Sequence, residues 1–95
     1  MKGYIVCVYE NINNQELLKN YALKAKQAVD KFEGKFLIRG GKNITTEGKD
    51  FIRTVVIEFS SFEVAKEFFN SKEYQDAHSV LGNSVIRHHQ IIEGS

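Results

Sequence analysis

The segment Gly3-Tyr4-Ile5-Val6-Cys7-Val8-Tyr9 is apolar at both odd and even positions. It is short and rich in β-branched and aromatic residues, a composition typical of a β-strand. Because successive side chains of a strand point to opposite faces of the sheet, both faces of this strand need cover. The segment is therefore predicted to be a central strand.

Two capping boxes predict where helices begin, Asn13-x-x-Glu16 and Ser60-x-x-Glu63. The first opens an amphipathic helix of about five turns that stops near Gly34. Its apolar face comprises Leu17, Tyr21, Ala25, Ala28 and Phe32. The second helix has an apolar face of Phe62, Val64, Ala65, Phe68 and Phe69. It breaks at Asn70 and Ser71, and a further helical stretch carries Tyr74, Ala77, His78 and Leu81 at helical spacing.

Three more strands are predicted, at residues 35–39, 51–59 and 85–93. The segment Glu47-Gly48-Lys49-Asp50 predicts a turn, so the second and third strands should form an antiparallel hairpin. If residues 42–47 continue the second strand, Gly40 and Gly41 interrupt it as a bulge or a sharp bend.

The predicted order is β-α-β-β-α-β in one domain over residues 1–95, since 95 residues leave no room for a second core. This α+β order is that of the ferredoxin-like fold, a four-stranded antiparallel sheet with its helices on one face. The other face would expose a large apolar patch in a monomer. We therefore expect a homodimer closed through the sheet faces.

Composition excludes several classes of protein. Thirteen basic and twelve acidic residues are interspersed, without the basic stripe of a nucleic-acid binder. The single cysteine, Cys7, cannot form an intramolecular disulfide, and no Cys/His spacing matches a metal site. No glycine-rich nucleotide loop is present. We expect no cofactor. With no signal pattern and no apolar run long enough for a membrane span, a cytoplasmic location is predicted.

Five ordered motifs carry a family resemblance: Gly3-Tyr4, residues 36–41, residues 55–63, residues 71–75 and Ile92-Glu93-Gly94. Together they span nearly the whole chain and resemble the domain-of-unknown-function 1330 family. Lys72 departs from that family's pattern, which often has proline after the serine. The resemblance implies a dimeric α+β barrel. Proteins of that superfamily include cofactor-free monooxygenases, isomerases, haem enzymes and ligand-sensing domains, so the resemblance implies no single reaction.

Arg39-Gly40-Gly41 is the leading ligand-binding candidate. Backbone N–H groups of the glycines and the guanidinium of Arg39 would converge on one carboxylate or phosphate. The alternative is structural: Arg39 pairs with a carboxylate such as Glu58, beside a bulge that bends the hairpin.

His78 is the candidate catalytic residue, because it shares a helical stripe with Tyr74 and Leu81 that is expected to face the sheet. Tyr74 is the candidate ligand contact beside it. The alternative is that His78 is a hydrogen-bonded core residue. His88 and His89 should point to opposite faces of the last strand, so they cannot chelate one metal ion together.

The remaining polar candidates have structural alternatives. Cys7 is expected to act as a small buried hydrophobe. Tyr4, Tyr9 and Tyr21 could line a pocket between the sheet and the helices, or simply form core.

Two hypotheses for function follow. In the first, the protein binds a small polar or carboxylated metabolite between the sheet and the helices, with isomerase-like or cofactor-free oxygenase-like activity. In the second, it is a non-catalytic ligand-binding or protein-interaction module. They differ in whether titratable groups converge in one enclosed cavity.

Overall fold

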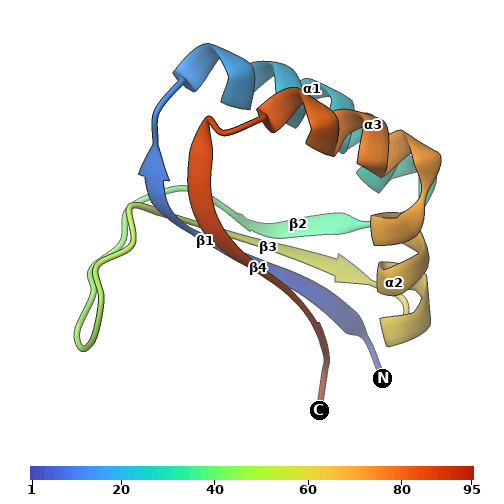
Figure 1. Cartoon of the computed structure of the whole chain (residues 1–95). Coiled ribbons are helices and arrows are strands. Elements are labelled where there is room, and N and C mark those ends of the chain that lie inside the picture. The colour runs from blue at the N-terminus through green and yellow to red at the C-terminus, as the bar shows by residue number, and fades with distance from the viewer.

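The computed structural model describes all residues, 1–95, and has an α+β architecture (Figure 1). Its elements are β1 (Gly3–Ile12), α1 (Gln15–Lys31), β2 (Lys35–Arg39), β3 (Arg53–Phe59), α2 (Phe62–Asn70), α3 (Lys72–Leu81) and β4 (Val85–Glu93). The predicted ferredoxin-like order is confirmed, with the second helical region divided into α2 and α3 at Ser71.

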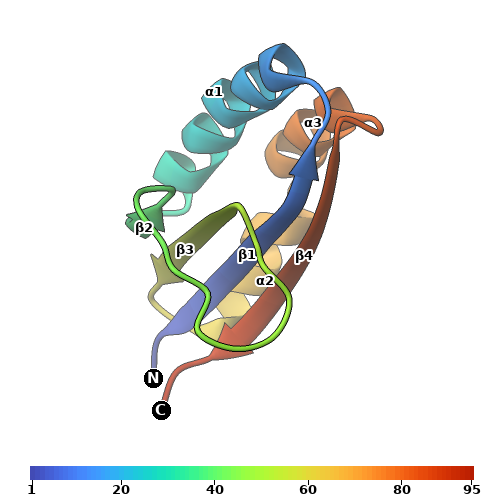
Figure 2. The ribbon, with the colours of Figure 1, turned by 90° about the vertical axis from the view of Figure 1, so that its left-hand side faces the viewer.

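The four strands form one antiparallel sheet in the order β2-β3-β1-β4. Figure 2 shows them side by side in this order, and Figure 1 shows α1 and α3 above one face of the sheet. As expected, β1 is a central strand, hydrogen-bonded to β3 on one side and to β4 on the other.

The two faces of the sheet differ in burial. On β1, Ile5, Cys7 and Tyr9 are at most 3% exposed and face the helices, while the alternate residues Tyr4, Val6 and Val8 are only half-buried. The face beneath the helices, which we call the inner face, holds the core. The opposite, outer face has no helix over it (Figure 1).

Both helix starts lie one residue later than the capping boxes predict. Asn14 caps α1 by accepting from the Leu17 N–H at 3.0 Å, while the side-chain oxygen Oδ1 of Asn13 accepts from Asn11 Nδ2. Ser61 caps α2 by accepting from the Val64 N–H at 3.1 Å. Neighbouring residues able to cap compete for this position, and the backbone of the preceding turn selects one of them.

Residues 42–47 do not continue the second strand. After Arg39 the chain forms a loop through residues 40–52 that extends away from the sheet (Figure 1). Gly40 and Gly41 have φ angles of +72° and +96°, so the backbone leaves the strand conformation there. The predicted turn at Gly48 lies within this loop, with φ at +83°.

No helix is long and apolar enough to cross a lipid bilayer.

Candidate functional site

A cavity lies between the inner face of the sheet and the helices. Its volume is about 60 Å³, enough for roughly four water molecules. Seventeen residues line it, of which thirteen are hydrophobic or aromatic. The other four are Arg39, Arg53, Arg87 and His89. The cavity is therefore an apolar chamber whose charged lining residues are all arginines.

Strand register brings the three arginines of the chain to this cavity. Tyr9 of β1 pairs with Arg53 of β3 on one side and with Arg87 of β4 on the other. Arg39 of β2 pairs with Val55, two residues beyond Arg53 on β3. Residues directly opposite in a ladder point to the same face. All three arginines therefore emerge on the inner face at one end of the sheet.

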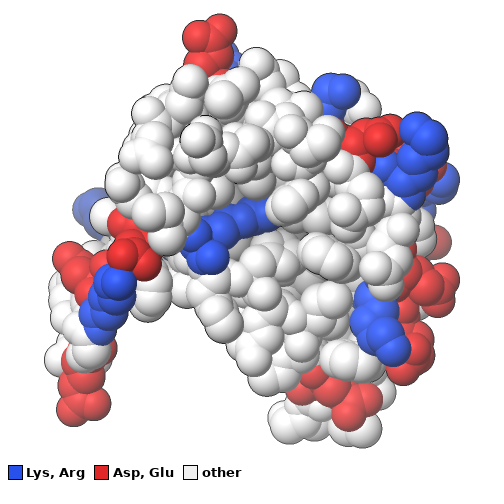
Figure 3. All heavy atoms as spheres, viewed as in Figure 1, with Lys and Arg blue, Asp and Glu red and all other residues white.

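No carboxylate accompanies these arginines. No Asp or Glu lines the cavity, and every ion pair in the structure uses a lysine. Figure 3 shows a basic side chain lying in a hollow between the helices and the sheet, surrounded mainly by uncharged atoms. A guanidinium stays charged in proteins, and a charge removed from water needs partners.

Arg87 donates hydrogen bonds to hydroxyl groups and to one thiol. Its Nη1 atom donates to Tyr9 Oη at 3.1 Å, Tyr21 Oη at 3.3 Å and Cys7 Sγ at 3.5 Å, and its Nη2 atom donates to Tyr74 Oη at 3.1 Å. The guanidinium also lies 5.6 Å and 5.1 Å from the ring centroids of Tyr9 and Tyr21. No protein atom accepts from Nε. One Nη2 hydrogen is also unused, because an arginine has five N–H donors.

A chain of polar groups leads from Arg87 to His89. Tyr21 Oη and Tyr74 Oη lie 2.9 Å apart, and Tyr74 Oη lies 3.5 Å from His89 Nε2. Burial, followed by the charge of Arg87, lowers the pKa of His89 to about 4, so its imidazole is neutral at pH 7. Burial raises the pKa of Tyr9 to about 12 and that of Tyr74 higher still, so both phenols stay protonated.

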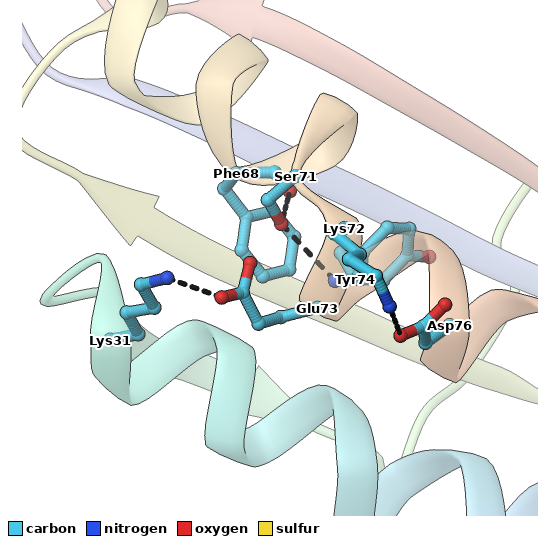
Figure 4. A network of polar contacts seen from close by, with 7 residues as sticks. All are labelled: Lys31, Phe68, Ser71, Lys72, Glu73, Tyr74 and Asp76. Carbon is cyan, nitrogen blue, oxygen red and sulfur yellow. Dashed lines mark hydrogen bonds and ion pairs between the residues drawn. The ribbon is translucent and has the colours of Figure 1, made fainter.

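The break between α2 and α3 places Tyr74 in this chain (Figure 4). Ser71 Oγ accepts from the Tyr74 N–H at 3.1 Å and donates to the Phe68 carbonyl at 2.6 Å. An ion pair between Lys31 and Glu73 joins the end of α1 to the start of α3. This arrangement holds Tyr74 opposite Tyr21, with the two rings edge to face at 6.1 Å.

Arg39 lines the cavity, but its side chain is exposed, so it lies where the cavity meets solvent. Its guanidinium is 4.2 Å from the Phe36 ring centroid. The alternative pairing with Glu58 is absent: Glu58 instead accepts a hydrogen bond from Tyr4 Oη at 3.2 Å, on the outer face.

Gly40 and Gly41 do not line the cavity. The motif suggests that the Gly40 N–H could bind an anion. In the structure this N–H instead donates to the Thr54 carbonyl at 2.9 Å. Gly40 instead makes room for Arg53, because a Cβ atom at Gly40 would overlap Arg53 Nη1. A Cβ at Gly41 would meet nothing within 4 Å.

His78 is exposed and is not buried against the sheet. It lines a second, open groove between α3 and β4, which shares Arg87 and His89 with the cavity. Its ring centroid is 6.1 Å from that of Tyr74, and partial burial and Arg87 lower its pKa. His88 is exposed and His89 half-buried, in agreement with their predicted placement on opposite faces.

Sequence reasoning missed Arg53, Arg87 and the inward position of His89. The signal was present in β4, where Val85, Arg87, His89 and Ile91 alternate with exposed residues. A cation and a histidine at the inward positions of a strand indicate a polar site within the core. Of the other polar candidates, Cys7, Tyr9 and Tyr21 line the cavity and Tyr4 does not.

The sequence matches, over residues 2–95, the family described as Domain of unknown function (DUF1330). The chain belongs to this family. A search of curated proteins finds no significant match. Further comparison of this DUF1330 protein therefore uses solved structures that share its fold.

Solved structures with the same fold share little sequence with this DUF1330 chain. A protein of unknown function from Rhodopseudomonas palustris has a TM-score of 0.78 at 11% identity, covering 99% of this chain and 82% of its own. A dimeric ferredoxin-like protein of unknown function from Jannaschia sp. CCS1 has a TM-score of 0.77 at 10% identity, covering 99% and 100%. A variant of SnoaB, a cofactor-independent oxygenase from Streptomyces nogalater, has a TM-score of 0.65 at 7% identity, covering 98% and 92%.

Proposed function

We propose that this protein binds a small carboxylated or otherwise anionic molecule in the cavity between the sheet and the helices. The observation that carries the proposal is the cavity lining: all three arginines of the chain and no carboxylate. The residues proposed to contact the ligand are Arg39, Arg53, Arg87 and Tyr74. Gly40 acts indirectly, by leaving space for Arg53.

Electrostatics favours an anionic ligand. Removing a guanidinium from water costs several kcal/mol unless charge and hydrogen bonds compensate. Neutral hydroxyls satisfy part of the hydrogen bonding of Arg87, but they supply no opposite charge. A bound carboxylate would supply that charge and accept from the Nε and Nη2 hydrogens that have no protein acceptor.

The walls of the cavity define the rest of the ligand. Aromatic rings of Tyr9, Tyr21, Phe36, Phe68 and Tyr74 are part of its lining. Small-molecule sites commonly combine apolar walls with a few polar groups that fix orientation. The ligand is therefore expected to be amphipathic, with an anionic group on a small apolar body.

The proposal includes a homodimer formed through the outer faces of two sheets. Ile38, Ile86 and Ile92 of that face are 44–50% exposed, and Tyr4, Val6, Val8 and Val56 lie half-buried beside them. An apolar surface of this kind marks an interaction site. The similar Jannaschia protein is dimeric, which supports the same assembly here. The cytoplasmic location stays a prediction.

An enzymatic role is the second candidate, and the polar chain from Tyr21 through Tyr74 to His89 favours it. These groups could move a proton to or from a bound ligand, as isomerase-like or cofactor-free oxygenase-like chemistry requires. His89 is closer to the cavity than His78, whose catalytic role stays a prediction. Without proton transfer, the protein is a non-catalytic ligand-binding or protein-interaction module.

Thermal unfolding with small carboxylates, beginning with acetate, butyrate and benzoate, tests the binding proposal. A ligand present at about 100 times its Kd stabilises the fold by about 2.7 kcal/mol, which raises Tm by roughly 10 to 20 °C. The shift should disappear in Arg87→Met. It should persist in Lys24→Met, which removes one charge from an exposed site on α1. No Arg87-dependent shift with any anion would contradict the proposal.

Hydrogen exchange separates the enzymatic from the non-catalytic form. A proton-transfer enzyme should exchange carbon-bound hydrogens of a bound 3-oxo acid with D₂O faster than the solution rate, as followed by NMR. The acceleration should be lost in His89→Gln and kept in His88→Gln, whose side chain lies on the outer face. Binding without accelerated exchange would support the non-catalytic module.

A further inference from the structure

We propose that the ligand carries two anionic groups, one bound by Arg87 and the other by Arg39 and Arg53. This inference rests on the proposed anion-binding function and specifies its ligand class. The ligand would be a small dicarboxylate, or an equivalent dianion, whose two charges are joined by an apolar spacer. The two positions are called here the deep site, at Arg87, and the mouth site, at Arg39 and Arg53.

The sheet register keeps the two sites apart. Arg53 and Arg87 flank Tyr9 in a single row across β3, β1 and β4. Neighbouring strands are about 4.8 Å apart, so the Cα atoms of the two arginines lie about 10 Å apart. A single carboxylate is too small to contact two guanidinium groups whose Cα atoms lie this far apart and whose side chains do not point toward each other.

The side chains do diverge. Arg87 extends from β4 toward Tyr9, Tyr21 and Tyr74, all of which accept hydrogen bonds from it. Arg53 turns the other way, with Nη1 packed against Gly40 at the end of β2. The strand order β2-β3-β1-β4 therefore places the two guanidinium groups on opposite sides of the cavity.

Arg39 adds a second charge to the mouth site. It pairs with Val55 on the strand that carries Arg53, on the same face and two residues along. It is exposed, yet it lines the same cavity. Two guanidinium groups at one opening, with no carboxylate between them, repel each other unless an anion binds there.

Charge balance favours a dianion. The cavity lining contributes three positive charges and no negative charge. If a single anionic group fills the deep site, the two cations of the mouth site remain uncompensated. A second anionic group can compensate the mouth site at little desolvation cost, since Arg39 is already solvated.

The surface between the two sites indicates the chemistry and length of the ligand's spacer. Tyr9 and Val55 separate the deep site from the mouth site along the sheet, so the middle of the ligand meets apolar surface. A cavity of about 60 Å³ holds one carboxylate and a few carbon atoms. The second anionic group must then lie at the mouth, which favours short linear diacids.

Isothermal titration calorimetry on the full chain with matched acids tests the inference. Each diacid is compared with the monoacid of equal chain length: succinate with butyrate, glutarate with pentanoate, and adipate with hexanoate. The best diacid should bind about tenfold tighter than its monoacid, a difference of about 1.4 kcal/mol. The gain should shrink as salt rises, because the exposed mouth site is screened.

Variants test which arginine binds which anionic group of the ligand. Arg39→Met and Arg53→Met should each reduce the affinity for the diacid much more than the affinity for the monoacid. Arg87→Met should weaken both acids, and Lys24→Met should change neither. Amide NMR spectra of each variant confirm that it is folded before the affinities are compared.

The outcomes separate this inference from the proposed function. If diacids and monoacids bind equally, and both depend on Arg87, the two-anion ligand is wrong and the anion site stands. If Arg39→Met and Arg53→Met weaken monoacids as much as diacids, the three arginines form one site and the inference is overturned. If no acid in either series binds, both the inference and the anion site are wrong.

Discussion

The phenolic oxygens of Tyr21 and Tyr74 lie 2.9 Å apart, although the two residues are 53 positions apart in the sequence. Tyr21 comes from α1 and Tyr74 from the first turn of α3, so this contact joins the two helices above the sheet. Both oxygens also accept hydrogen bonds from Arg87. The pair therefore links helix packing directly to the cationic cavity.

A double-mutant cycle on this pair should reveal coupling. Tyr21→Phe and Tyr74→Phe should each destabilise the fold by about 1 to 3 kcal/mol, because each leaves buried polar partners unsatisfied. Their effects should be non-additive by about 1 kcal/mol, as measured by urea unfolding. The control cycle pairs Tyr9→Phe with Tyr74→Phe, since Tyr9 shares only Arg87 with Tyr74. Equal coupling in both cycles would contradict a direct Tyr21–Tyr74 hydrogen bond.

Alanine at Gly40 should cost more than alanine at Gly41. Both glycines have positive φ, so each substitution strains the backbone by about 1 kcal/mol. Only at Gly40 would the new Cβ also displace the Arg53 guanidinium. Gly40→Ala should therefore weaken carboxylate binding as well as stability, whereas Gly41→Ala should lower stability alone. Calorimetric titration with succinate and urea unfolding measure the two effects, and equal loss of affinity in both variants would argue against this role of Gly40.

The depressed pKa of His89 predicts acid sensitivity. The imidazole binds a proton near pH 6.5 in the unfolded chain but only near pH 4 in the fold. The unfolded state therefore holds more protons between these values, and stability falls as pH falls from about 6.5 to about 4. The loss due to this residue is at most about 3 kcal/mol.

Urea unfolding at a series of pH values measures this loss. His89→Gln should have a flatter profile than the parent over this range, whereas His88→Gln, with its side chain on the outer face, should keep the parent's slope. An unchanged slope in His89→Gln would show that His89 is not held neutral by the fold.

A charge placed on the outer face should dissociate the proposed homodimer. Val6 lies on this face in the centre of the sheet, next to Val56 of β3. A standard interface buries about 800 Å² per partner, and an unpaired carboxylate at its centre is strongly unfavourable. Val6→Glu should therefore elute as a monomer in size-exclusion chromatography with light scattering. Leu23→Glu, at a residue 60% exposed on α1, should leave the assembly unchanged.

The fold was largely predictable because its signals are local. Alternation marked β4 at its observed bounds, and helical periodicity marked α1 and α3. The errors occurred where the local sequence is compatible with two different backbone structures. Adjacent capping residues shifted the helix starts by one position, and the paired glycines ended β2 where the sequence also allowed a continued strand.

The site was less predictable than the fold. The sequence singled out Arg39 and Tyr74, and both line the cavity. It overlooked Arg87, which donates hydrogen bonds to four residues 13 to 80 positions away. No local pattern reports such distant partners.

The order of the elements and the alternation of side chains along the last strand follow from the sequence, because periodicity is a property of neighbouring residues. The positions of Arg53 and Arg87 on either side of Tyr9, and of Arg39 at the same end of the sheet, follow from the pairing of the strands in the folded protein. Register between strands depends on how the whole inner face packs against the helices, and a shift of one residue would turn each side chain to the other face. The cationic cavity is a product of that register.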